Sequence, residues 1–249
     1  MSKHTPTSPR DKADSRFSTT HWSVILAAGA SASVGSREAL ERLCKTYWYP
    51  LYTYLRRRGC DMHQAEDCTQ GFFAALLQRH ALERASPEQG KFRSFLLSSL
   101  NHFLADQWDH AAAQKRGGGK ELISLDVEDA ETRYQLEPSH DLTPENLFEK
   151  SWSLMVLNNA MARLRAEFAE AGRQELFESL KPHLPAGRGP ASYKDVAARL
   201  GMTEGAVKVA VHRLRDRYRQ LVREEIAQTV STPEQVDEEI RDLFASLAD

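Results

Sequence analysis

The chain has 249 residues and a nearly balanced charge, with 33 Lys and Arg against 35 Asp and Glu. That length accommodates two small domains or one large one. Charged residues make up 27% and hydrophobic residues 41%, and no apolar run approaches the roughly 18 residues that span a bilayer. The N-terminal stretch MSKHTPTSPRDKADSR has no apolar core behind it, which argues against a secretory signal. We expect a cytoplasmic protein without a membrane span.

Three cysteines, Cys44, Cys60 and Cys68, are an odd number in such a chain and are predicted to be reduced thiols. Cys60, His63 and Cys68 lie close enough in sequence to suggest zinc. Their spacing fits no common zinc site, however, and no fourth ligand is evident. We predict structural cysteines, no metal and no cofactor.

Helix signals dominate the first half of the chain. Residues 1–35 are predicted to be a tail, in which THWSVIL could form a short extra helix or a partner-binding element. Ser36 is a candidate cap for a helix that Pro50 interrupts, and a further helix is expected to end at Arg58 before Gly59. Asp61 with Gln64 resembles a capping box that opens a helix with an apolar side, formed by Ala65, Cys68, Phe72, Ala75 and Leu76.

A long amphipathic helix is predicted over residues 92–113. Its buried stripe is expected to be Phe92, Phe95, Leu96, Leu100, Phe103 and Leu104. Hydrogen-bonding groups and an aromatic ring occupy much of the rest, followed by a basic pair, which suits a surface that holds unpaired bases. The candidates are Asn101, His102, Asp106, Trp108, Lys115 and Arg116. Packing of Trp108 against a neighbouring helix is the simpler alternative. Similarly, Arg56, Arg57 and Arg58 could either complement the end of their helix or hold DNA backbone.

Residues 116–142 are predicted to be an acidic linker, because residues 120–149 hold nine Asp and Glu against two Lys and Arg. Thr143 followed by Pro144 predicts a helix start, with a helix to about Ala171 and another around Leu176 to Leu180. The sequence from Thr232 onward predicts a short acidic terminal helix. No β-alternation of useful length occurs, so the predicted fold is all-α.

The stretch from Ser192 to Arg223 predicts a helix-turn-helix. Ser192 with Asp195 forms a capping box, Gly201 allows a turn, and Thr203 is a candidate N-cap for a second helix running past Tyr218. The first helix is expected to bury Val196, Ala197 and Leu200, and the second Ala206, Val207, Ala210, Leu214, Tyr218 and Leu221. Eight Lys and Arg against three Asp and Glu lie between residues 192 and 223. A helical hairpin with a solvated basic face is the alternative.

In a helix-turn-helix, the N-terminal half of the second helix enters the major groove. Gly205, Lys208, Val209, His212 and Arg213 would then face the bases. Lys208 and Arg213 suit guanine or phosphate, and Arg215, Arg217 and Arg219 are candidate phosphate clamps. The predicted DNA-binding residues on this helix pair are Thr203, Lys208, Val209, His212, Arg213, Arg215 and Arg217.

Several segments in order resemble one family. YWYPLYTYLRRRG, AEDCTQGFFAALLQR and FRSFLLSSLNHFLADQWDHAAAQKR look like region 2 of a sigma-70-type factor, and more narrowly of the extracytoplasmic-function (ECF) group. SYKDVAARLGMTEGAVKVAVHRLRDRYRQL resembles region 4 of that group. The likeness covers most of residues 37–225. Phe95 stands where the family commonly has tryptophan, and His102 aligns with its usual asparagine, with Asn101 one residue earlier.

The resemblance implies a promoter-recognition subunit that binds core bacterial RNA polymerase and catalyses nothing itself. Region 4 would bind the −35 duplex, and the helix from Phe92 would hold the opened −10 strand. The segment that docks on the polymerase would contain Glu66, Asp67, Gln70 and Phe73. An anti-sigma factor or another regulatory protein is a partner that the family allows. The linker is long for compact members of the group.

The predicted organisation is therefore a tail at 1–35, a region 2-like domain at 36–115, the linker at 116–142, a region 4-like domain at 143–225 and an acidic extension at 226–249. The rival hypothesis is a stand-alone helix-turn-helix regulator with a sensing or partner-binding N-terminal domain. An enzyme is not expected, because the histidines are scattered and no catalytic set or phosphate-binding loop can be assembled.

Overall fold

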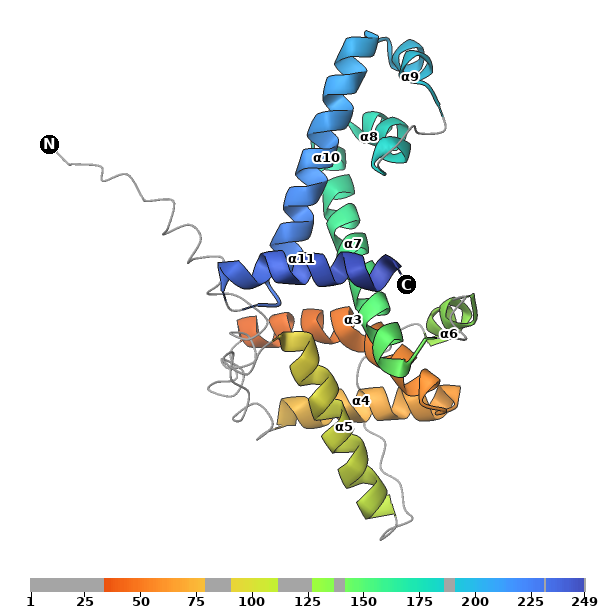
Figure 1. Ribbon diagram of the computed structural model, residues 1–249, viewed down its shortest axis with the longest axis vertical. Helices are drawn as coiled ribbons and strands as arrows, with labels where there is room; N and C mark the ends of the chain where they lie inside the picture. The colour runs from red at the N-terminus through yellow and green to blue at the C-terminus, as the bar shows by residue number, and fades with distance from the viewer. Residues whose placement is uncertain are drawn as a thin grey trace, which may run out of the picture. The chain divides into compact units, whose positions relative to one another are not determined.

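The computed structural model describes residues 34–78, 91–111, 127–136, 142–185, 191–230 and 232–248 (Figure 1). Every element within these ranges is helical, so the predicted all-α fold is confirmed. No helix in this part of the chain is both long enough and apolar enough to cross a lipid bilayer. The THWSVIL segment and most of the predicted N-terminal tail lie outside the described residues.

The chain divides into two compact units. Unit 1 comprises Met1–Leu154 and Ala227–Asp249, and unit 2 comprises Met155–Ile226. These boundaries differ from the predicted ones, because the first part of the helix that begins at Pro144 and the whole C-terminal helix belong to unit 1.

The first three helices of unit 1 are α3 (Val34–Arg57), α4 (Met62–Gln78) and α5 (Phe92–Ala111). The predicted break at Pro50 is wrong, since α3 continues through it. Proline removes one backbone donor from a helix, but large side chains on both sides of Pro50 are fully buried and hold the two halves in one core. These side chains are Tyr47, Leu51, Tyr52 and Leu55.

The start of α4 follows the predicted capping box. The backbone N–H of Gln64 donates to Asp61 Oδ1 at 2.8 Å, and the N–H of Asp61 donates to Gln64 Oε1 at 3.1 Å. Further along, Gly71 lies so close to α5 that an added Cβ would come within 3.3 Å of Phe103 Cζ. This glycine therefore sets how closely α4 and α5 pack.

The segment predicted as an acidic linker contains a helix, α6 (Val127–Leu136), which the sequence did not predict. Glu131 on α6 is buried, and its carboxylate accepts from Arg56 Nη2 at 2.7 Å and from the hydroxyl of Tyr52. Arg133 lies 4.1 Å above the ring of Tyr49. Tertiary contacts with α3 thus fold a segment whose own hydrophobic periodicity is weak.

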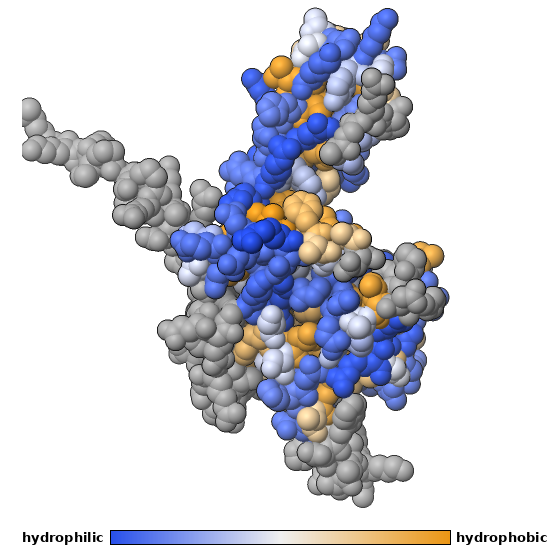
Figure 2. All heavy atoms as spheres, in the orientation of Figure 1, coloured by the Kyte–Doolittle hydropathy of each residue, from blue (hydrophilic) through white to orange (hydrophobic). Residues whose placement is uncertain are grey.

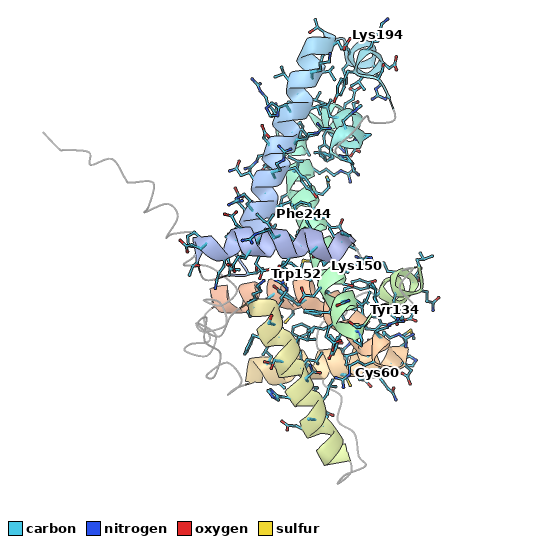
Figure 3. All side chains as sticks on the ribbon, in the orientation of Figure 1. Cys60, Tyr134, Lys150, Trp152, Lys194 and Phe244 are labelled. Carbon is cyan, nitrogen blue, oxygen red and sulfur yellow. The ribbon has the colours of Figure 1, made fainter. Side chains whose placement is uncertain are left out.

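Two further helices complete unit 1. The helix α7 (Pro144–Glu170) begins as predicted, with Thr143 Oγ1 accepting from the N–H of Asn146 at 3.2 Å. The C-terminal helix, α11 (Pro233–Ala248), buries Glu239 in an ion pair with Arg93 of α5. The Arg93 guanidinium lies 4.4 Å above the ring of Trp152 of α7, which is labelled in Figure 3. The segment predicted as an extension is therefore part of this core.

Unit 2 combines the rest of α7 with α8 (Gln174–Leu180), the short 3-10 helix η2 (Lys181–His183), α9 (Tyr193–Leu200) and α10 (Glu204–Ala227). Polar contacts join α7 to α10: Arg163 pairs with Glu224 and Glu225 at 2.7 Å each. The hydroxyl of Tyr218 donates to the carbonyl oxygen of Leu157 at 3.1 Å. These contacts hold the C-terminal half of α10 against α7.

Candidate nucleic-acid interface

The first helix of the pair, α9, has well-defined ends. The N–H of Asp195 donates to Ser192 Oγ at 3.2 Å, and Asp195 Oδ2 accepts from the N–H of Ser192 at 3.3 Å, which confirms the capping box. The hydrogen bond from the Ser192 side chain lowers the pKa of Asp195. Gly201 ends the helix with φ +63°, a conformation that glycine adopts without a Cβ penalty. The turn expected at Gly201 is confirmed.

The second helix, α10, begins at the predicted cap. Thr203 Oγ1 accepts from the N–H of Ala206 at 3.2 Å, and the N–H of Met202 donates to the carbonyl of Ala197 at 2.9 Å. Thr203 was also predicted to contact DNA. Its hydroxyl oxygen caps the start of α10, and the residue is exposed to solvent.

The two sides of α10 differ sharply. Its buried residues are Val207, Val211, Leu214, Leu221, Val222 and Ile226. Ala206 was expected among the buried residues but is exposed, because it lies about 100° around the helix from Val207. Val211 is buried instead, because it lies about one helical turn after Val207 and on the same side. Of the first helix, Val196 and Ala197 are buried and Leu200 is partly exposed.

The predicted base-reading residues lie on the open side of α10. Lys208 and Arg213 are exposed, Val209 is 50% exposed and the His212 side chain is 74% exposed. Gly205, in the same row as Val209 and Arg213, has no atom within 4 Å of an added Cβ. The structure therefore brings four predicted side chains together on the N-terminal half of α10, all accessible.

Carboxylates moderate the charge of this face. Lys208 Nζ lies 2.8 Å from Glu204, a contact that raises the pKa of the lysine and keeps it protonated. Asp216 lies 3.3 Å from His212 and 2.7 Å from Arg219. Among the described residues, Arg213 has no carboxylate at ion-pair distance, so its guanidinium is the least engaged cation of the group.

Two predicted phosphate clamps have structural contacts instead. Arg215 Nε donates to the carbonyl of His183 and Arg215 Nη2 to that of Pro185, both at 3.0 Å. Arg217 Nε donates to Glu167 Oε2 at 2.8 Å. Both residues tie α10 to the rest of unit 2, and sequence spacing could not reveal this because the partners are distant in the chain.

On α5, some of the residues predicted to bind the DNA strand are hydrogen-bonded within the protein, and others are exposed to solvent. Asn101 Oδ1 accepts from the hydroxyl of Tyr54 at 2.9 Å and from Arg58 Nη1 at 2.5 Å. His102 and Asp106 are exposed, on the same side as Ser94 and Ser98. His102 is therefore the more accessible of the two candidate base readers. The Trp108 side chain, Lys115 and Arg116 lie outside the described residues.

The predicted polymerase-docking residues on α4 differ in their exposure to solvent. Asp67 is exposed, while Glu66 and Gln70 are half-buried and joined by a 3.1 Å hydrogen bond from Gln70 Nε2 to Glu66 Oε1. Phe73 is only 3% exposed and packs against Phe72. A partner could reach the three polar side chains, but Phe73 belongs to the core.

The arginine run at the end of α3 is held within unit 1. Arg56 binds Glu131, Arg57 Nε donates to the carbonyl of Leu142 at 2.7 Å, and Arg58 binds Asn101. For Arg58 the sequence offered a role at the helix end or on DNA backbone, whereas the structure shows it in contact with Asn101, a candidate base-contacting residue. No local sequence signal marks this contact.

Cys60 and Cys68 are half-buried free thiols, and burial raises the pKa of each. No group of three His, Cys, Asp or Glu side chains in the described part of the chain is arranged to hold a metal ion. The chain matches no family model, no curated protein and no solved structure in the three comparisons made.

Proposed function

We propose that this protein is a promoter-recognition subunit of bacterial RNA polymerase, of the ECF sigma type that its sequence resembles. The observation that carries the proposal is the exposed row of Lys208, Val209, His212 and Arg213 on a helix that follows a capped helix and a glycine turn. A helix-turn-helix uses this part of its second helix to contact base edges. The protein would act in the cytoplasm and catalyse no reaction.

In this proposal unit 2 binds the intact −35 duplex. Arg213 is suited to donate two hydrogen bonds to O6 and N7 of a guanine, and Lys208 to one base acceptor or phosphate. Val209 can contact a thymine methyl group, and His212 a base edge or phosphate. Arg215 and Arg217 contribute by fixing the position of α10 rather than by direct contact.

Unit 1 would hold the opened −10 strand on α5. The side chains of Ser94, Ser98, His102 and Asp106 are exposed on one side of this helix. Hydroxyl, imidazole and carboxylate groups can pair with the Watson–Crick edges of unstacked bases. The Arg58 contact fixes Asn101 beside them, so the amide can still offer its NH₂ group to a base.

Core RNA polymerase is the proposed partner, with Glu66, Asp67 and Gln70 in the docking segment. The test is association of the full chain with purified core enzyme at low salt, followed by footprinting of promoter DNA with and without core. We expect stable association and a footprint that requires core. No association would overturn the proposal, and a full footprint by the chain alone would favour a stand-alone regulator.

The matched control for the DNA contacts is Arg165→Ala. Arg165 is an exposed arginine on α7 that pairs with Glu178 at 3.0 Å, away from the α10 row. In the presence of core, Arg213→Ala should weaken the promoter footprint about 5- to 150-fold, equivalent to about 1–3 kcal/mol. Arg165→Ala should leave the footprint unchanged.

A further inference from the structure

Unit 2 contains a pocket of about 650 Å³, and two of the residues that line it, Val209 and Arg213, are also proposed DNA contacts. The pocket lies between the end of α7, α8 and the first half of α10, and its volume is in the range typical of small-molecule sites. Its lining is largely apolar, including Phe168, Leu176, Leu180, Met202, Val209 and Leu214. Figure 2 shows hydrophobic side chains between hydrophilic ones on the visible face of unit 2.

The rim of the pocket has an excess of positive charge. Arg173, Arg213, Arg217 and Glu167 line it. Arg217 and Glu167 pair with each other, which neutralises both. Arg173 lies 5.1 Å above the ring of Phe168, and neither it nor Arg213 has a carboxylate partner among the described residues. Two positively charged side chains therefore border the apolar pocket, and no carboxylate among the described residues pairs with either of them.

We propose that this pocket binds an amphiphilic anion, with an aliphatic chain against the apolar lining and a carboxylate or phosphate head on Arg173 and Arg213. Removing the chain from water favours its entry. Guanidinium groups bind such heads through charge-assisted hydrogen bonds. The apolar lining alone would accept any hydrophobic group, and the two arginines select the negative head.

Occupation would also affect the DNA-facing surface, a consequence that depends on the proposed function. Val209 and Arg213 line the pocket and also belong to the exposed row of α10. An anion that engages Arg213 removes it from a base or phosphate. Ligand and duplex should therefore compete.

Gly205 offers a variant that blocks the pocket without disturbing the fold. It lines the pocket, and a Cβ added there meets no atom within 4 Å. Gly205 lies in the first turn of α10, where leucine is also a better helix former than glycine. Gly205→Leu should fill the entrance, and Ala198→Leu is the matched control because Ala198 is exposed on α9 and does not line the pocket.

The test is isothermal titration calorimetry of the full chain, without DNA or polymerase, using decanoate, decyl phosphate and decyltrimethylammonium below their micelle-forming concentrations. We expect at least one anion to bind one-to-one and at least tenfold more tightly than the cation; the tighter anion identifies the head group. Gly205→Leu should weaken that binding at least tenfold and Ala198→Leu should leave it unchanged. Arg173→Gln with Arg213→Gln should weaken the anion at least fivefold.

Absence of binding by both anions would overturn the site, as would equal affinity for anion and cation or unchanged binding to Gly205→Leu. Because this measurement involves no nucleic acid and no polymerase, its failure would leave the promoter-recognition proposal intact. Conversely, failure of the chain to associate with core enzyme would leave the ligand site intact.

Discussion

Glu131 of α6 and Arg56 of α3 form a two-point ion pair, in which Arg56 Nη2 donates to Oε1 at 2.7 Å and Nε donates to Oε2 at 3.0 Å. Their positions are 75 residues apart in sequence. The pair fixes a helix within a stretch that composition describes only as acidic, and the Tyr52 hydroxyl completes the site.

Removing this carboxylate should destabilise unit 1. Glu131→Ala leaves the Arg56 guanidinium partly buried without its partner, a loss of about 2–3 kcal/mol in unfolding free energy. Urea denaturation measures it. Asp67→Ala is the control, since Asp67 is an exposed carboxylate on α4 and its loss should change stability by less than about 0.5 kcal/mol. Equal effects of both substitutions would contradict the assigned role of the pair.

The same carboxylate should make stability depend on pH. Burial raises the pKa of Glu131, but hydrogen bonds from Arg56, Tyr52 and Gln135 outweigh it and hold the pKa below its usual 4.5. A lowered pKa stabilises the fold above the unfolded-state value, and this contribution is lost as pH falls through the folded-state pKa. The stability difference between wild type and Glu131→Gln should be constant from about pH 7 to 5 and shrink below about 4.5. A difference that grows on acidification would contradict the ion pair.

Two glycines in unit 2 should respond to alanine in opposite ways. Gly201→Ala places a Cβ at φ +63° and should cost about 1 kcal/mol. Gly205 lies in the first turn of α10 with open space around it, so Gly205→Ala should stabilise by about 0.4–1 kcal/mol. Urea denaturation of both variants tests the turn and the helix together. A gain at Gly201 would mean that the turn is not where we place it.

His183 should titrate at an unusually low pH. Its side chain is 2% exposed, and burial lowers its pKa below 6.5, with Arg215 and Arg199 adding to the effect. Since folding lowers this pKa, the contribution to stability is present above about 6.5 and is lost as pH falls through the folded-state value. NMR titration of the imidazole, assigned with His183→Gln, measures it. A midpoint at or above 6.5 would show that the ring is not buried as described.

If α10 binds DNA, Asp216 should oppose binding. It is exposed and lies beside His212 and Arg219 on the outer face. Asp216→Asn removes a negative charge near the phosphates, so promoter affinity should rise about threefold at low salt, and the gain should diminish as salt screens the charge. Glu178→Gln on α8 is the control and should have no effect. A decrease in affinity on Asp216→Asn would place the DNA elsewhere.

Local chemistry made part of this fold predictable. The capping contacts at Asp61, Thr143 and Ser192 join residues three apart, and the turn at Gly201 needs only one backbone conformation. The sequence signals for these features are therefore sufficient by themselves.

Features that depend on distant partners were not predictable. The continuity of α3 through Pro50 and the folding of α6 both depend on the core of unit 1. The buried ion pair of Arg93 with Glu239 joins α5 to α11, which are far apart in the sequence, and the acceptors of Arg215 lie about 30 residues away from it. In the candidate interface, the sequence correctly predicted that Lys208, Val209, His212 and Arg213 are exposed, but it wrongly placed Ala206 among the buried residues. It also did not reveal that Arg215, Arg217 and Phe73 contact other parts of the fold.

The most direct test of the proposed function is transcription by purified core RNA polymerase with and without this chain, on fragmented DNA of the source genome, with sequencing of transcript 5′ ends. We expect new start sites that share upstream elements and that appear only when the chain is added. These start sites should be lost with Arg213→Ala but kept with Arg165→Ala. Identical start sites with and without the chain would contradict it.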